Sequence, residues 1–319
     1  MPIIKFFKNR TKKQKIIILI VAVIILVFSI LKLYFPSFNF SSWTKTINSV
    51  SKIGNTNDAE EQPLSVHFID VGQGDCIFVK GENGSILIDT GNPEDSTKIS
   101  RYLLERNVTS LDYLILTHPH ADHAGGAEGI ISHIEVKSII MPRVPDELVP
   151  TAMWYSNLVK AIKANNISVY AAHAGDEYSF SDASFTVLAP VNNSDDLNDM
   201  SVIIKLVYKN TSFLFTGDAG FDEEMSVLTS GVDVKSDVLK IGHHGSRYST
   251  SDDFFAAVSP DVAVISCGKD NKYGHPNKEI TELLRMNKTP YLRTDRNGTV
   301  VIGSDGEKLY CFFERGKVQ

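Results

Sequence analysis

The sequence predicts an α/β fold in which two β-sheets pack against one another with helices outside, preceded by one N-terminal transmembrane helix. Three observations lead to this prediction. Short apolar runs separated by glycine-containing turns begin at Leu64, amphipathic helical patterns alternate with later runs of this kind, and an uncharged apolar run occupies residues 16–31. Because an apolar sheet face must be buried against another layer, this alternation favours one layered domain of about 255 residues.

The N-terminal region predicts a membrane anchor. Residues 1–15 contain six lysines and arginines and no acidic residue, and with residues 32–35 the apolar run reaches about 20 residues, enough to cross ~30 Å of hydrocarbon. The excess of cations before the run favours a cytoplasmic N-terminus and an extracellular C-terminus. A cleaved signal peptide is the alternative, but no small-residue cleavage site follows the run.

The predicted organisation therefore has four parts. A basic cytoplasmic segment at 1–15 precedes a single-pass anchor in the cell membrane at 16–35. A linker rich in Ser, Asn and Thr follows at 36–62, and an extracellular domain occupies 63–319. The three cysteines form no disulfide framework, so we expect buried free thiols.

Within the extracellular part, three strands are predicted first, at 64–71, 75–80 and 85–91, because β-branched residues are separated there by glycine turns. Apolar residues on one helical face then predict a helix at 94–106, before a strand at 111–117. The later helices are expected from about residue 125 and at 151–165, 221–230, 251–258 and 277–287. The later strands are expected at 136–142, 167–172, 183–190, 200–208, 211–218, 236–242, 261–266, 299–304 and 308–314.

The charge of the extracellular part argues against a global attraction for polyanions. The first 40 residues hold seven of the 32 lysines and arginines and none of the 38 acidic residues, which leaves 25 basic against 38 acidic residues, or about −13, in the rest. A domain of this charge would need a local basic groove to bind nucleic acid.

Ligand-type side chains are concentrated in the stretch "THPHADHAGG", residues 117–126, directly after a predicted strand. Imidazole and carboxylate are the ligands that zinc, and less often iron or manganese, takes in proteins. His118 and His120 lie two apart and can converge on one ion, while Asp122 and His123 turn toward a second. The alternative is a polar loop with incidental histidines.

Two further strand ends carry similar residues. Asp218 in "TGDAG" would emerge beside the first cluster and bridge two ions, although a strand-end Asp can also cap a helix. His243 and His244 in "LKIGHHGS" are adjacent and point to opposite sides, so we expect only one of them to bind metal. Ser246 and Arg247 open a loop that suits an anion.

The motifs "ILIDTG", "HPHADH", "TGDA" and "HHGS" together resemble the metallo-β-lactamase superfamily in the usual order. "VHFIDVGQGDCIFVK", "LKIGHHGSRYSTS" and "DVAVISCGKDNKYGHP" resemble more narrowly the extracellular hydrolase domain of the competence protein ComEC. They are more loosely similar to the choline-phosphate esterases of cell-wall teichoic acid. The resemblance covers about residues 64–315 and implies an αββα sandwich.

The resemblance also implies a ligand set and a mechanism. Two divalent ions are expected, zinc or alternatively manganese, held by His118, His120, Asp122, His123, Asp218 and His244. Asp89 would orient the metal loop. Asp122, Asp218 and His243 would serve catalysis, with water activated by the ions for attack on an ester.

One position departs from the superfamily pattern. A further histidine usually lies before the strand that here reads "MSVIIKLVY", but this chain has Asn198 and Asp199 there. The first metal position would then be completed by one of these residues or by water, and a one-metal state or loss of activity remains open.

The leading prediction is a membrane-anchored extracellular metal-dependent hydrolase, a phosphodiesterase acting on nucleic acid, with Ser246, Arg247, Tyr273 and His275 contacting substrate. One alternative is a cell-wall or lipid phosphoester hydrolase, and another is a catalytically weak metal-binding interaction module. A β-lactamase is the least favoured, because fold alone does not give function. ComEC has many membrane spans and this chain one predicted span, so we do not expect a DNA channel by itself.

Overall fold

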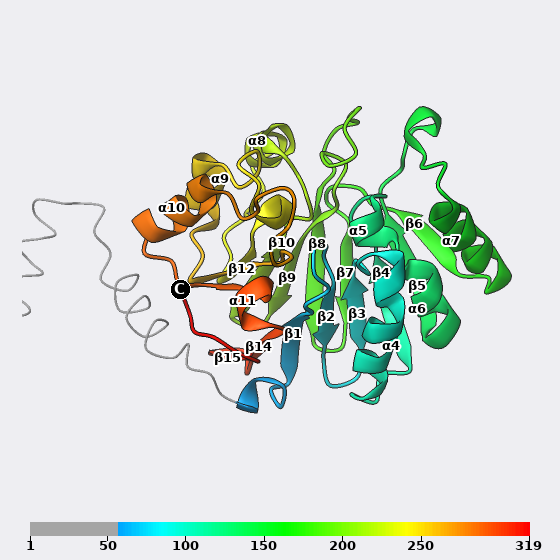
Figure 1. The fold of residues 1–319 in the computed structure, drawn as a ribbon, viewed down its shortest axis with the longest axis horizontal. Coiled ribbons are helices and arrows are strands. Elements are labelled where there is room, and N and C mark those ends of the chain that lie inside the picture. Colours follow the sequence, from blue (N-terminus) through cyan, green and yellow to red (C-terminus); the bar gives the residue numbers. More distant parts are fainter. Residues whose placement is uncertain (1–56) are drawn as a thin grey trace, which may run out of the picture. The chain divides into compact units, whose positions relative to one another are not determined.

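Two β-sheets lie between two layers of helices in the computed structural model, which describes residues 57–319 (Figure 1). The basic segment predicted at 1–15, the anchor predicted at 16–35 and residues 36–56 of the predicted linker lie outside the described residues. No helix within 57–319 has the length and apolar character needed to cross a bilayer.

The first sheet has eight strands in the order β15-β14-β1-β2-β3-β4-β5-β6. Its strands are β1 (Leu64–Phe68), β2 (Ile77–Lys80), β3 (Ser85–Ile88), β4 (Ser110–Ile115), β5 (Glu135–Met141), β6 (Ser168–Ala171), β14 (Val300–Ser304) and β15 (Leu309–Phe313). Strands β1 to β3 form an antiparallel meander, and β3 to β6 run parallel. The chain returns to this sheet only at its C-terminal end, where β14 pairs with β1.

The second sheet has seven strands in the order β13-β12-β11-β10-β9-β8-β7. Its strands are β7 (Glu177–Phe180), β8 (Ala183–Ala189), β9 (Ile203–Tyr208), β10 (Thr211–Phe215), β11 (Val238–Lys240), β12 (Val262–Ile265) and β13 (Tyr291–Arg293). Strands β10 to β13 run parallel, and β7 to β10 are antiparallel.

Helices cover the outer face of each sheet (Figure 1). Those beside the first sheet are α4 (Ser96–Leu104), α5 (Ala121–Ala124), α6 (Ala127–His133) and α7 (Met153–Ala164). Those beside the second sheet are α8 (Phe221–Thr229), α9 (Asp252–Val258) and α10 (Lys278–Met286), and α11 (Thr294–Asn297) follows β13. Short 3-10 turns are η1 (Asn57–Ala59), η2 (Pro93–Asp95), η3 (Asp146–Leu148) and η4 (Gly242–Gly245).

Three apolar clusters hold these layers together. The inner cluster fills the space between the sheets with side chains such as Phe68 and Phe215, whose rings lie 6.2 Å apart. One outer cluster packs α4, α6 and α7 on the first sheet, and the other packs α8, α9 and α10 on the second. The predicted sandwich of two sheets with helices outside is therefore confirmed.

Most of the predicted elements are present, and two strands were missed. The short strands β7 ("EYSF") and β13 ("YLR") contain no β-branched residue, whereas the equally short β2, β3, β6, β11 and β12 each contain at least one. The expectation of buried free thiols is confirmed for Cys76, Cys267 and Cys311.

The parallel strands of both sheets end at one edge of the sandwich. Asp89 follows β3 and His118 follows β4 in the first sheet, while Asp218 follows β10 and His243 follows β11 in the second. The carboxyl ends of parallel strands are the usual location of sites in open α/β sheets. This topology brings ligand-type residues from three distant parts of the sequence to the same edge.

Strand β1 carries a buried histidine that makes the fold sensitive to acid. His67 is 1% exposed; its Nε2 lies 2.8 Å from Ser65 Oγ and its Nδ1 lies 2.8 Å from Tyr102 Oη. Burial, aided by the nearby Arg106 and Lys80, lowers the pKa of His67 to about 3. The folded protein therefore keeps this ring neutral at pH values where an unfolded chain protonates it.

We expect His67→Gln to reduce the acid sensitivity of folding. With a folded-state pKa below the unfolded value, stability is present above pH ~6.5 and is lost by about 1.4 kcal/mol per pH unit as pH falls toward 3. Chemical denaturation from pH 7 to 4.5 should show a shallower loss for His67→Gln than for wild type. The exposed His133→Gln is the control and should follow wild type; equal slopes for all three proteins would contradict this assignment.

Candidate metal centre

The loop after β4 supplies the first pair of nitrogen donors. His118 is fully buried, and its Nε2 lies 2.9 Å from Nδ1 of His120. The other nitrogen of His118 lies 3.1 Å from Thr117 Oγ1. Thr117 Oγ1 donates its own hydrogen to Asp89 at 2.6 Å, so it accepts a hydrogen from His118 Nδ1. The Nε2 atom of His118, which faces His120, therefore carries the electron pair of this ring. Burial, with the neighbouring His123, lowers the pKa of His118 well below its usual value.

Asp89 holds this loop from behind. Its Oδ1 accepts the backbone N–H of Thr117 at 2.8 Å, and its Oδ2 lies 2.7 Å from Nδ1 of His123. These contacts place a proton on His123 Nδ1, so the Nε2 atom of that ring presents an electron pair. Asp89 therefore orients the loop and faces away from the Nε2 side of His123.

The second sheet contributes a buried carboxylate. Asp218 is 2% exposed, and its backbone N–H donates to Ser201 Oγ at 3.1 Å. Its Oδ2 lies 3.3 Å from His123 Nε2 and 3.4 Å from His244 Nε2. Within residues 57–319 its Oδ1 is buried without a hydrogen-bond partner. A buried carboxylate oxygen left in this way indicates a missing cationic partner.

The turn η4 presents two adjacent histidines in unusual backbone conformations. His243 has φ +48° and His244 has φ +56°, the left-handed region that non-glycine residues rarely adopt. Such strain is concentrated at functional sites. Gly245 continues the turn at φ +85°, and a side chain there would clash with Pro276. His244 is buried and faces the cluster, whereas His243 is half-buried, with Nε2 3.6 Å from Asp218 Oδ2.

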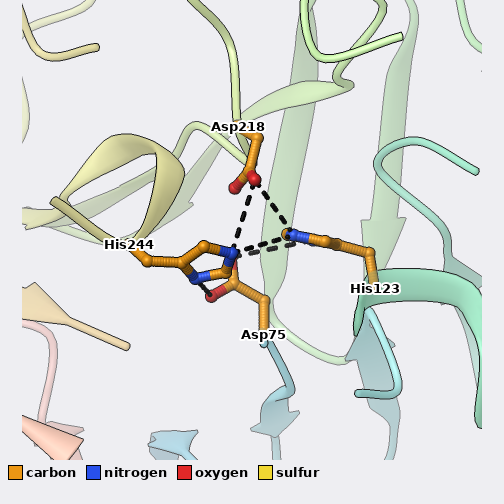
Figure 2. Close-up of side chains that lie close together, drawn as sticks. All are labelled: Asp75, His123, Asp218 and His244. Atoms are coloured by element: carbon orange, nitrogen blue, oxygen red, sulfur yellow. Dashed lines mark hydrogen bonds and ion pairs between the residues drawn. The ribbon is translucent and has the colours of Figure 1, made fainter. Parts of the chain in front are cut away.

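The donor set fits divalent metal ions. Figure 2 shows Asp218 facing both His123 and His244, whose Nε2 atoms are 3.3 Å apart. His244 Nδ1 lies 3.1 Å from the carbonyl oxygen of Ser266, so its proton is on that nitrogen, and Nε2 faces the cluster as an electron pair. Asp122 Oδ2 adds a further oxygen 3.4 Å from His244 Nε2. Electron pairs gathered this closely require positive charge among them.

The pKa shifts of His123 and Asp122 reflect the same need for positive charge at the cluster. Burial alone would lower the pKa of His123, but the carboxylates of Asp218 and Asp89 raise it well above its usual value. Burial would likewise raise the pKa of Asp122, but the hydrogen bond with His244 and the charge of His123 lower it to about 2. The carboxylates therefore favour positive charge at these rings, which protons supply in the absence of metal and which bound metal ions would supply in their place.

Two residues that the sequence analysis missed lie behind these ligands. Asp75, 1% exposed, belongs to the "VGQGD" turn, and Lys240, 0% exposed, lies in β11. Their side chains form an ion pair. Burial alone would raise the pKa of Asp75, but Lys240, with His244, lowers it to about 2. The sequence did contain two signals that could have identified them: Asp75 is an acidic residue in a glycine-rich turn, and Lys240 is a lysine within an apolar strand.

The missing superfamily histidine is replaced by a short polar segment. Asp199 Oδ1 accepts the backbone N–H of Gly220 at 2.8 Å, so this carboxylate holds a neighbouring loop. Asn198 lines the same cavity as His120, and within the described chain its buried Oδ1 has no hydrogen-bond partner. Of the two residues, Asn198 is the one that lines the cavity together with His120.

A cavity of about 330 Å³ opens over the cluster. It is lined by Gln73, His120, Ala121, Asp122, Asn198, Asp218, His243, His244, Tyr273 and His275. The rings of Tyr273 and His275 stack at 5.6 Å, and burial lowers the pKa of His275 to about 4. The mouth of the cavity therefore offers neutral imidazole and phenol groups.

Two residues predicted to contact substrate do not line this cavity. Ser246 is buried, and its Oγ accepts the backbone N–H of Tyr248 at 3.3 Å. Arg247 points to the surface, where its guanidinium lies 3.1 Å from Glu279 Oε1. Their predicted contacts with an anion remain predictions.

A second cavity of about 380 Å³ adjoins the first at Asn198, Asp218 and His243. Its other lining residues are Asp196, Asp199, Gly220, Phe221, Asp222 and Tyr248. Among the described residues no lysine or arginine lines either cavity. The two adjoining cavities form one cleft, and the second cavity is its acidic arm, lined by carboxylates and by the aromatic rings of Phe221 and Tyr248.

Comparison with known proteins agrees with this geometry. Residues 69–269 match the model of the Metallo-beta-lactamase superfamily. The chain belongs to this superfamily. It is 32% identical over 259 residues to ComE operon protein 3 of Bacillus subtilis, covering 74% of this chain and 32% of that protein. It is 31% identical over 250 residues to Competence protein ComA of Neisseria gonorrhoeae, covering 76% and 33%.

These matches confirm the resemblance to the ComEC family, and the chain spans about a third of the length of these curated relatives. Among solved structures, CmlA, a diiron beta-hydroxylase from Streptomyces venezuelae, aligns with a TM-score of 0.51 at 16% identity, covering 71% of this chain and 51% of that one. At this identity the likeness concerns the fold alone. The chain thus carries a ComEC-like metallo-β-lactamase hydrolase fold with a buried His/Asp cluster suited to metal.

We expect the triple variant His118→Ala, His120→Ala, Asp218→Ala to lose metal, because it removes donors from both sheets. Elemental analysis of wild type should find up to two zinc or manganese ions, and the variant should also unfold at a lower temperature, since metal binding is linked to folding. The exposed His133→Ala and His173→Ala are controls that should keep full occupancy. Full occupancy in the triple variant would show that the ions bind elsewhere.

Proposed function

We propose that the protein is a metal-dependent hydrolase that cleaves phosphodiesters, with nucleic acid as the first candidate substrate. The observation that carries the proposal is the convergence of His123, Asp218 and His244 at the base of an open cavity. Bound divalent ions would supply a Lewis acid and lower the pKa of coordinated water toward neutrality. The resemblance to the ComEC hydrolase domain implies phosphodiesters as the class of ester, and relatives that include a competence protein support that resemblance.

His118, His120 and Asn198 would hold the first ion. Asp122, His123 and His244 would hold the second, and Asp218 would serve both. This division is the one that the resemblance implies, and the two close nitrogen pairs, His118 with His120 and His123 with His244, support it.

The residues at the mouth would bind and orient substrate. Burial lowers the pKa of both His243 and His275, so their rings are neutral near pH 7 and can donate or accept a hydrogen bond at a phosphoryl oxygen. The exposed ring of Tyr273 stacks on His275 and offers a surface for a base or a sugar.

A second candidate is a small cell-wall or lipid phosphoester, and the acidic arm of the cleft favours it. Asp196, Asp199 and Asp222 line that arm, and no lysine or arginine within residues 57–319 lines it. These carboxylates would repel a polyanion that extends past the metal centre. A compact substrate presented at the cell surface does not meet this repulsion.

We also propose that the chain is a single-pass protein of the cell membrane with residues 63–319 outside. The basic segment and apolar run at residues 1–35 support this topology. Protease added to intact cells should then remove a C-terminal tag, and a protected tag would contradict it.

We expect zinc- or manganese-loaded protein to hydrolyse bis-p-nitrophenyl phosphate and not nitrocefin. Turnover of single-stranded DNA that falls with salt would support nucleic acid, whereas greater turnover of p-nitrophenyl phosphorylcholine would support the compact phosphoester. Bound metal with activity on none of these compounds would favour a non-catalytic module.

Variants separate the roles of two residues near the cavity. His243→Gln should keep both ions and lose at least about 10-fold in turnover, because His243 faces the cavity and His244 the cluster. Arg247→Ala, on the same loop, is the matched comparison. It should lower DNA turnover at low salt only if Arg247 breaks its ion pair with Glu279 and contacts the substrate instead. Unchanged activity in both variants would remove them from the substrate site.

A further inference from the structure

Lys240 is a charged residue in the interior of a buried strand. Its ammonium forms an ion pair with Asp75 and donates to the carbonyl oxygen of Gly217 at 3.2 Å. Both members of the pair are at most 1% exposed. Removing two such charges from water is costly, so a pair of this kind is weak evidence for stability and suggests a role in specifying geometry.

The two oxygens of Asp75 face different partners. Its Oδ2 contacts Lys240, and its Oδ1 lies 3.4 Å from Nδ1 of His244. The metal-facing nitrogen of His244 is Nε2, which lies 3.4 Å from Asp218 Oδ2. Asp75 and Asp218 therefore approach opposite edges of the same ring (Figure 2).

His123 shows the same arrangement with another carboxylate. Its Nδ1 lies 2.7 Å from Asp89 Oδ2, while its Nε2 faces Asp218. Carboxylates that bind the rear nitrogen of a metal-ligating histidine fix its tautomer and ring orientation. Asp75 lies on the Nδ1 side of His244 as Asp89 lies on the Nδ1 side of His123, but the contact is looser. The Nδ1 proton of His244 is donated to the Ser266 carbonyl oxygen, and Asp75 Oδ1, 3.4 Å from Nδ1, has no hydrogen-bond partner within residues 57–319.

We propose that Asp75 and Lys240 form a positioning pair for the metal centre, in which Asp75 orients His244, Lys240 holds Asp75, and neither residue binds metal. Lys240 acts on a second ligand as well, because its bond to the Gly217 carbonyl oxygen fixes the residue that precedes Asp218. One ammonium thus connects the turns that carry His244 and Asp218. The inference rests on the metal-binding part of the proposed function and not on the ester that is cleaved.

The competing assignment makes Asp75 a metal ligand. A carboxylate oxygen of Asp75 lies within 4.8 Å of ligand atoms from His123, Asp218 and His244. Proximity allows this role, and so does the buried Oδ1 of Asp75, which has no hydrogen-bond partner within residues 57–319. Against it, both ring contacts of Asp75 are with Nδ1 atoms, at 3.4 Å for His244 and 4.0 Å for His123. A ligand sharing an ion with these rings would lie on their Nε2 side, where Asp218 and Asp122 are.

The test compares Asp75→Asn, Lys240→Met and the double variant with wild type. Zinc affinity is measured by chelator competition, bound metal by elemental analysis, and thermal unfolding of the metal-free proteins by calorimetry. Lys205→Met is the matched control, because Lys205 also forms an ion pair with an aspartate. Its partner Asp233 lies on the protein surface and is far more exposed than Asp75. A second readout uses wild type alone: ¹⁵N NMR of the zinc-loaded protein reports which nitrogen of His244 carries the proton.

We expect each single variant to keep the wild-type number of ions but to bind zinc about 10- to 100-fold more weakly, while Lys205→Met stays at the wild-type affinity. The metal-free double variant should unfold at a higher temperature than the weaker single variant, because each single change leaves one buried charge without its partner. His244 should carry its proton on Nδ1.

Three results would overturn the proposal. Loss of one ion in Asp75→Asn and in the double variant, but not in Lys240→Met, would identify Asp75 as a ligand. A double variant no more stable than the weaker single variant, or unfolded, would show that the two charges do not compensate one another. A His244 proton on Nε2 would place the metal on the Asp75 side. Absence of metal from wild type would contradict the proposed function itself, together with this inference.

Discussion

Two imidazole nitrogens and a carboxylate meet in the buried centre of this protein, and their arrangement depends on positive charge among them. The Nε2 atoms of His123 and His244 lie 3.3 Å apart, and Asp218 reaches both. Protons are held on the opposite nitrogens by Asp89 and by the Ser266 carbonyl oxygen. In an environment of low dielectric constant, electron pairs so placed repel one another unless a cation lies between them.

This requirement links the two sheets. His123 belongs to the loop that follows β4 of the first sheet, whereas Asp218 and His244 follow β10 and β11 of the second. A cation bound at this point crosslinks the halves of the sandwich, so its binding free energy contributes to folding. The strained left-handed backbone at His243 and His244 depends on the same centre, because the contacts of His244 with Asp122 and Asp218 compensate its strain.

The sequence predicted that these His and Asp residues lie close together, because they occur in compact motifs at strand ends. Apolar runs with β-branched residues located most strands, but β7 and β13 contain no β-branched residue and were missed. Asp75 and Lys240 could not be paired from sequence, because 165 positions separate them and only the sheet order brings them together. The surface ion pair of Arg247 with Glu279 was equally hidden, since it depends on how α10 packs beside η4.

A crystal structure of the protein grown with Zn²⁺ or Mn²⁺, with anomalous scattering recorded at the absorption edge of the metal, is the most direct test of the metal centre. We expect an anomalous peak at bonding distance from Asp218 and from Nε2 of both His123 and His244, with Asp75 and Asp89 on the Nδ1 sides of the two rings. A peak ligated by Asp75, or an ordered cluster with no peak in metal-containing crystals, would contradict this expectation.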